Sequence, residues 1–80
     1  MGIADVRRAF VEGMGNSGAS CTTATMNYEP DDDGRRTNQR LNFTVQNAGA
    51  AETVTSVVPA GGDLVKAARV LGETYKIEHQ

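Results

Sequence analysis

The residues best suited to chemistry crowd into one stretch, EPDDDGRRTNQR at positions 29–40, where acidic and basic side chains flank a glycine. Carboxylates at every second position before a glycine are typical of a calcium-binding EF-hand loop. Aligned on Gly34, the first three side-chain ligand positions of such a loop are Glu29, Asp31 and Asp33. The twelfth position requires a bidentate glutamate but holds Arg40, a cation that repels the ion. We therefore expect no bound metal and no cofactor.

Other side chains that could act as nucleophiles, bases or metal ligands are few. The one histidine, His79, is second from the end, where chains are usually loose. The one cysteine, Cys21, has no neighbouring cation in sequence to lower its pKa, and one Cys with one His cannot complete a zinc site. The serines, at positions 17, 20 and 56, lack the context of a hydrolase nucleophile. These patterns predict a protein that is not an enzyme.

A glycine pair in the sequence PAGGDL, residues 59–64, precedes a helix start, where backbone N–H groups can bind an anion. Asp63 at the cap position would itself occupy those donors and repel the anion. Lys66 does not follow the glycines at the spacing of a phosphate-binding loop. The pattern favours a structural turn and cap, with anion binding at Gly61-Gly62 as the alternative.

The remaining candidate is a set of polar and basic residues suited to contact with a partner. Arginine and amide side chains recognise acidic proteins and nucleic acids alike. Three neighbouring aspartates weaken the local positive field, which disfavours non-specific binding to phosphates, whereas a specific protein contact tolerates mixed charge. The candidate partner-binding residues are Arg35, Arg36, Asn38, Arg40, Asn42 and Thr44.

Length and composition limit what can position these residues. Eighty residues form one domain, 1–80, and two Phe, two Tyr and no Trp supply a thin core. A thin core in a short chain favours a homodimer or docking on a partner. A net charge of −2 lacks the basic excess of most nucleic-acid-binding domains. The single cysteine, the polar start and the lack of a long apolar run predict a cytoplasmic protein with no membrane partner.

Hydrophobic spacing then predicts the elements at the two ends of the chain. Ile3, Val6, Phe10 and Met14 share one face of a helix over 3–14. A second helix over 63–71 begins at the cap Asp63 and ends before Gly72 as its C′ residue. Residues 74–80 alternate as a short strand with Tyr75 and Ile77 inward, although a continuous helix to about residue 77 keeps the spacing too.

The central part of the chain has the pattern of a hairpin over 20–46, with strands at 20–28 and 41–46 and a third strand at 51–58. A two-residue turn at Asp33-Gly34 makes facing residue numbers sum to 67. The apolar residues of both strands then share one face, in the pairs Met26–Leu41, Ala24–Phe43 and Thr22–Val45. Across the tip, the same register pairs Asp32 with Arg35 and Asp31 with Arg36. The polar face of this hairpin would carry Thr23, Thr25, Asn27, Arg40, Asn42, Thr44 and Gln46.

The order helix, three strands, helix is similar to that of the double-stranded RNA-binding domain. That family grips the RNA backbone with a Gly-rich, Lys-Lys-Ala-type start to its last helix. The corresponding stretch here, GGDLVKAAR at 61–69, has Asp63 where cations are needed and a single lysine. The topology is shared, but the RNA-gripping motif is absent.

We therefore expect an α+β fold: a small antiparallel sheet of three to four strands with its central hairpin at 20–46, an N-terminal helix and a second helix near 63–71. The expected function is a non-enzymatic protein-binding module, such as an adaptor or a small phage-type inhibitor that docks on another protein. The alternative is a nucleic-acid-binding domain that uses the arginine-bearing hairpin segment 35–40.

Overall fold

The first helix, α1 (Ile3–Met14), forms where the apolar spacing predicted it. The computed structural model describes residues 2–35 and 37–79. In α1, Val6, Phe10 and Met14 are fully buried, while Ile3 at the exposed start is 36% accessible. Asp5 lies in the first turn, where its negative charge is favoured by the helix dipole.

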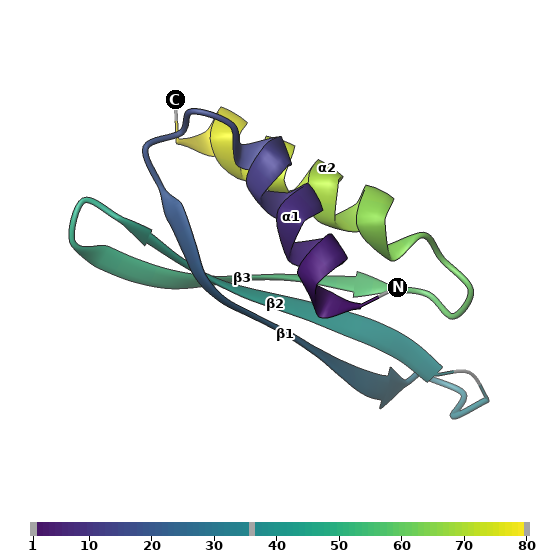
Figure 1. Ribbon diagram of the computed structural model, residues 1–80. Helices are drawn as coiled ribbons and strands as arrows, with labels where there is room; N and C mark the ends of the chain where they lie inside the picture. Colours follow the sequence, from purple (N-terminus) through teal and green to yellow (C-terminus); the bar gives the residue numbers. More distant parts are fainter. Residues whose placement is uncertain (1, 36, 80) are drawn as a thin grey trace.

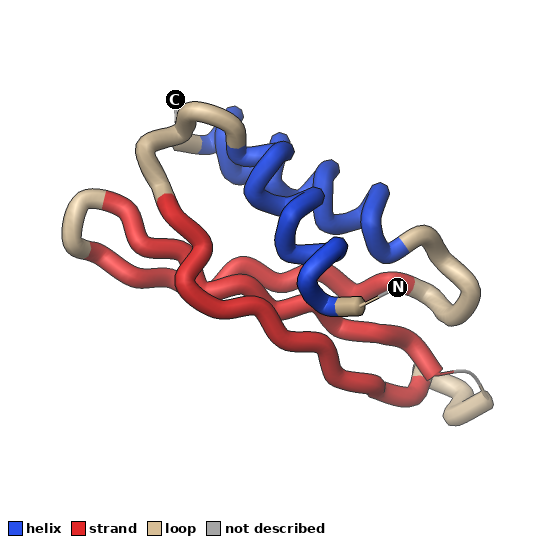
Figure 2. The backbone as a smooth tube through the Cα atoms, viewed as in Figure 1, coloured by secondary structure: helices blue, strands red, loops and turns tan. Residues whose placement is uncertain are grey.

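Three antiparallel strands follow, β1 (Ser20–Pro30), β2 (Thr37–Asn47) and β3 (Ala50–Val58), in the spatial order β1-β2-β3. The last element is a helix, α2 (Leu64–Glu78). Both helices lie side by side on the same face of the sheet, and the opposite face is left without a covering layer (Figure 1, Figure 2). The expected small α+β fold is confirmed, with three strands rather than four.

The predicted pairing of β1 with β2 is confirmed over most of its length. Met26 faces Leu41 and Ala24 faces Phe43. Towards the start of β1, the register shifts by one residue between Cys21 and Thr23, so Cys21 faces Val45. The predicted pair Thr22–Val45 is therefore wrong, because a β-bulge adds one residue to β1 and turns Cys21 into the core.

The connection between these strands is longer than the predicted two-residue turn at Asp33-Gly34. β1 ends at Pro30 and β2 begins at Thr37. Within the connection, the Gly34 N–H donates to the Asp31 carbonyl oxygen at 3.0 Å. The Arg35 N–H donates to Asp31 Oδ1 at 2.9 Å.

The charge pairs predicted across that tip do not form as expected. Asp32 and Arg35 lie in the loop, outside the ladder, and no ion pair joins them in the part of the chain that the structure describes. The predicted partner of Asp31, Arg36, lies outside the described residues. The physical reason is local: the Asp31 carboxylate satisfies a backbone N–H of the loop, and Pro30 has no N–H to extend the ladder.

The last helix runs through residues 74–78, which lie in the segment predicted as a strand. Residues 64–78 are continuously helical, so the strand over 74–80 is wrong and the alternative, the longer helix, is correct. Tyr75 is buried at 3% accessibility, whereas Ile77, expected inward, is 69% accessible. The helical spacing from Leu64 through Ala68 and Leu71 to Tyr75 thus decides the structure here.

Gly72 is an interior residue of α2 and not its C′ residue. A Cβ atom built on Gly72 would clash with the Phe10 carbonyl oxygen, and one on Gly13 would clash with the Arg69 carbonyl oxygen. The two glycines therefore let the backbones of α1 and α2 touch.

The core lies between this helix pair and the sheet. Phe10 of α1 stacks on Phe43 of β2 with 4.1 Å between ring centroids. The central strand contributes most of the buried sheet side chains, since all three of its inward apolar residues are fully buried. The buried apolar residues of the core are Val6, Ala9, Phe10, Met14, Cys21, Leu41, Phe43, Val45, Val58, Ala68 and Tyr75. Across residues 2–35 and 37–79, neither helix has the length and apolar character that a membrane crossing needs.

Candidate partner-binding surface

The side of the sheet that faces away from the helices carries rows of short polar side chains. Successive residues of a strand point to opposite faces, so the neighbours of buried Leu41, Phe43 and Val45 point outward. The strand pairings align these outward residues across the sheet. We call this surface the open face; its rows are Thr23–Thr44–Thr53, Thr25–Asn42–Thr55 and Asn27–Arg40–Val57.

Two polar contacts order side chains on the open face. The Asn42 amide nitrogen donates to Asn27 Oδ1 at 2.7 Å. Arg40 donates to both carboxylate oxygens of Glu29, at 2.8 Å from Nε and 3.0 Å from the terminal nitrogen. This hydrogen bond and the charge of Arg40 lower the pKa of Glu29, and Glu29 raises the pKa of Arg40 in return. Arg40 is thus part of a neutral pair rather than a free cation.

The structure brings together most of the residues that the sequence put forward. Arg40, Asn42 and Thr44 share the open face, and Asn38 continues the same side of β2 opposite Glu29. Arg35 is exposed in the connection after β1, beyond the ladder. Arg36 lies outside the described residues.

The third strand adds residues that the sequence reasoning missed. Thr53 and Thr55 complete two of the rows, and Val57, 42% accessible, ends the third. Their place is set by the hairpin turn Ala48-Gly49, whose φ values of 54° and 83° suit a tight two-residue connection. The β-branched composition of 51–58 predicts the strand, but the face that Thr53 and Thr55 occupy follows only from this turn.

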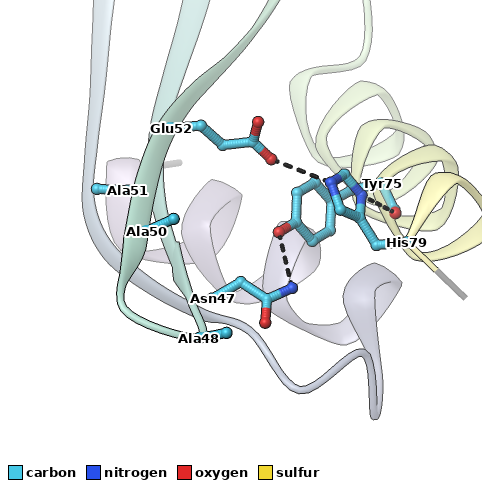
Figure 3. Close-up of a pocket in the computed structure, with 7 residues that line it drawn as sticks. All are labelled: Asn47, Ala48, Ala50, Ala51, Glu52, Tyr75 and His79. Carbon is cyan, nitrogen blue, oxygen red and sulfur yellow. Dashed lines mark hydrogen bonds and ion pairs between the residues drawn. The ribbon is translucent and has the colours of Figure 1, made fainter.

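A second cluster lies at the far end of α2 (Figure 3). The ring of His79 stacks on Tyr75 at 3.9 Å between centroids, and its Nε2 lies 3.3 Å from Glu52 Oε1. Asn47 donates to the Tyr75 hydroxyl at 3.4 Å. A hollow of about 390 Å³ lies beside this cluster. His79 therefore makes contacts that the sequence does not predict.

This cluster joins the end of α2 to β2 through Asn47 and to β3 through Glu52. His79 Nδ1 lies 2.9 Å from the Tyr75 carbonyl oxygen, which can only accept a hydrogen bond. Both ring nitrogens are thus engaged, one by Tyr75 and the other by Glu52. In the described ranges, no group of three or more metal-ligating side chains gathers here or elsewhere.

The other reactive candidates occupy structural positions. Cys21 is 5% accessible, and burial raises the pKa of its thiol, an effect that the charge of Arg7 partly offsets. At the helix start, Asp63 Oδ1 accepts the Lys66 N–H at 3.1 Å, and the Gly62 N–H donates to the Pro59 carbonyl at 2.9 Å. These donors already have partners, as a turn and cap require.

Comparisons with known proteins found no match for this chain among protein-family models, curated proteins or solved structures.

Proposed function

We propose that this chain is a non-enzymatic protein-binding module that docks on another protein through its open face. The observation that carries the proposal is the one-sided sheet, whose uncovered side presents rows of threonine and asparagine around Arg40. Hydroxyl and amide groups can both donate and accept hydrogen bonds, so they can exchange water for a partner's polar groups. Threonine is stiff at χ1 and loses little freedom when it becomes ordered in an interface.

The charge of the surface favours a protein over a nucleic acid. Nucleic-acid binding relies on cations that neutralise phosphates. Arg40, the cation on the central strand of the open face, is instead neutralised by Glu29. A surface of neutral polar groups with one internal ion pair suits the mixed contacts of a protein interface. Binding of this kind is sufficient for the function of an adaptor. It is also sufficient for a phage-type inhibitor, which acts by covering a functional surface of its target.

The test compares two added positive charges. Thr44→Lys places a charge at the centre of a row, between Thr23 and Thr53. Ala4→Lys adds the same charge to an exposed position of α1, in the layer opposite the open face. Thermal unfolding first shows that the wild type and both variants have the same Tm. Each protein is then immobilised and exposed to nuclease-treated lysate.

The proposal predicts proteins that the wild type and Ala4→Lys capture but Thr44→Lys does not. Capture of the same proteins by all three would show that the open face is not the contact. Recovery of RNA or DNA before nuclease treatment, with affinity that falls steeply as salt rises, would instead support the alternative of a nucleic-acid-binding hairpin at 35–40.

A further inference from the structure

The two edges of the sheet differ in how they are closed. Edge strands expose unpaired backbone groups, and proteins commonly block them with bulges, prolines or covering groups. β1 carries all three devices. It has a bulge at Cys21–Thr23 and Pro30 at its end, and Arg7 donates to the Cys21 carbonyl oxygen at 2.6 Å. β1 is therefore a poor template for another strand.

β3 has none of these devices along its nine residues. Ala50 faces Asn47 across the two-residue turn, and residues that flank such a turn form a hydrogen-bonded pair. Alternation along the strand then leaves the N–H and C=O groups of every second residue pointing out of the sheet. These residues are Ala51, Thr53, Thr55 and Val57. All four are exposed, and within the described ranges no loop or side chain hydrogen-bonds their backbone.

We propose that β3 pairs with β3 of a second copy of this chain in an antiparallel, two-fold symmetric dimer with one continuous six-stranded sheet. The axis passes beside Thr55. Thr55 then faces its own counterpart, and Thr53 faces Val57 of the second copy. On the inner side, Val54 faces Ser56 of the second copy.

The side chains of β3 are self-complementary in this register. The one charged residue of the strand, Glu52, faces Val58 of the second copy and so opposes no like charge. β-branched side chains form most of the remaining pairs, which suits cross-strand packing. A symmetric interface requires this kind of self-match, because the same patch serves on both subunits.

The helix above β3 supports the same axis. Leu71 and Thr74 line a groove together with Ser56, and they also line a hollow together with Val54. Because Thr55 lies between Ser56 and Val54 in β3, the middle of α2 lies level with Thr55. An axis beside Thr55 accordingly also relates the middle of α2 to the middle of its counterpart.

The side of α2 next to the β3 edge carries a stripe of residues spaced four apart: Lys66, Val70, Thr74 and Glu78. Around an axis at the middle of this stripe, Val70 meets Thr74 of the second copy. Lys66 meets Glu78 of the second copy, and symmetry repeats this opposite-charge contact. Val70 is half exposed in the single chain, above a groove of about 610 Å³ that the second copy would close.

The first test is the mass of the wild-type chain in solution, measured by light scattering across a concentration series. The dimer predicts twice the 8.5 kDa of the chain and a Tm that rises with protein concentration. A chain that stays at 8.5 kDa over the whole series overturns the proposal. The proposal would also be overturned if the β3 edge paired with another protein but never with β3 of a second copy.

A matched pair of variants then locates the interface. Thr25 and Thr55 flank the same residue, Asn42, on opposite edges of the sheet. Thr55→Lys sets two like charges against each other at the axis and raises the dimer dissociation constant about tenfold or more. Thr25→Lys adds the same charge to the open face at the blocked edge and leaves the dimer unchanged. Equal weakening by both variants would contradict pairing through β3.

Charge reversal tests the contact between the helices. Lys66→Glu turns the attraction to Glu78 into repulsion and weakens the dimer. The double variant Lys66→Glu/Glu78→Lys restores the attraction, and each new charge suits its end of the helix dipole better than the charge it replaces. Failure of the double variant to recover dimerisation would overturn the proposed axis. This proposal is independent of the proposed function, because Thr25→Lys alters the open face while sparing the dimer.

Discussion

The backbones of α1 and α2 touch where the two helices cross, and this crossing gives the sharpest prediction for stability. Gly72 faces the backbone of α1, where an added Cβ would clash with the Phe10 carbonyl oxygen and lie 2.9 Å from the Met14 nitrogen. Real Cβ atoms do not approach backbone that closely. Gly72→Ala therefore forces the two helices apart.

Two opposing effects set the size of this change. Alanine in place of glycine inside a helix normally adds about 1 kcal/mol of stability. A group forced into a packed interior costs about 1–3 kcal/mol, and the upper end applies here because backbone cannot rotate aside. We expect Gly72→Ala to lower the free energy of unfolding by about 2 kcal/mol. For a domain of this size, that lowers Tm by about 8–16 °C.

The assay is thermal and urea unfolding followed by circular dichroism at one protein concentration. Glu73→Ala, an exposed neighbour in the same helix, serves as the control and should change stability by less than about 0.5 kcal/mol. If Gly72→Ala were as stable as the wild type or more so, Gly72 would not lie against α1. The close helix contact described here would then be wrong.

Further predictions concern the helix cap, the ion pair and the thiol. Asp63→Ala removes the acceptor of the Lys66 N–H and should cost about 1 kcal/mol in urea unfolding; no loss would mean that the cap is not formed. Arg40 lowers the pKa of Glu29 below its usual 4.5, so the pair stabilises the fold above pH 4.5 and this contribution disappears as pH falls through the lowered pKa. The urea midpoints of wild type and Arg40→Gln should therefore differ at neutral pH and converge in acid, and a constant difference would contradict the pair. Iodoacetamide should modify buried Cys21 far more slowly in the native protein than in urea, and equal rates would show that the thiol is accessible.

Periodic patterns predicted the elements whose side chains alternate cleanly. The helix over 3–14 followed from spacings of three and four, and the pairing of Met26 with Leu41 followed from matching the apolar faces of two strands. The same alternation placed Arg40, Asn42 and Thr44 on one side of β2. A slip of one residue would have sent every one of these side chains to the other face.

The failures arose where tertiary contact overrides a local rule. Glycine usually ends helices, but Gly72 stays inside α2 because its missing side chain admits the backbone of α1. The seven residues of the segment 74–80 were too few to separate a helical period from a strand period. The bulge at Cys21–Thr23 has no sequence signal, since every residue there is a small strand former. The contact of His79 with Glu52 joins residues from two distant elements and depends on the whole fold.

Only part of the open face could be predicted from the sequence, for a related reason. The rows of the open face depend on β3, whose register follows from the turn at Ala48-Gly49. That turn has a glycine but not the Asn-Gly or Asp-Gly pair that marks most hairpins of this kind. Thr53 and Thr55 could be assigned to the face only once the turn was known.

The placement of the candidate residues on the open face depends on the register of β1 against β2, and one NMR measurement tests it directly. In an antiparallel pair, the Cα atoms of facing residues approach to about 4.5 Å where the pair is not hydrogen-bonded. The structure predicts strong Hα–Hα cross-peaks between Met26 and Leu41 and between Ala24 and Phe43. Cross-peaks displaced by one residue, such as Met26 to Asn42, would put an inward and an outward residue on the same face and contradict the register on which the proposed binding surface depends.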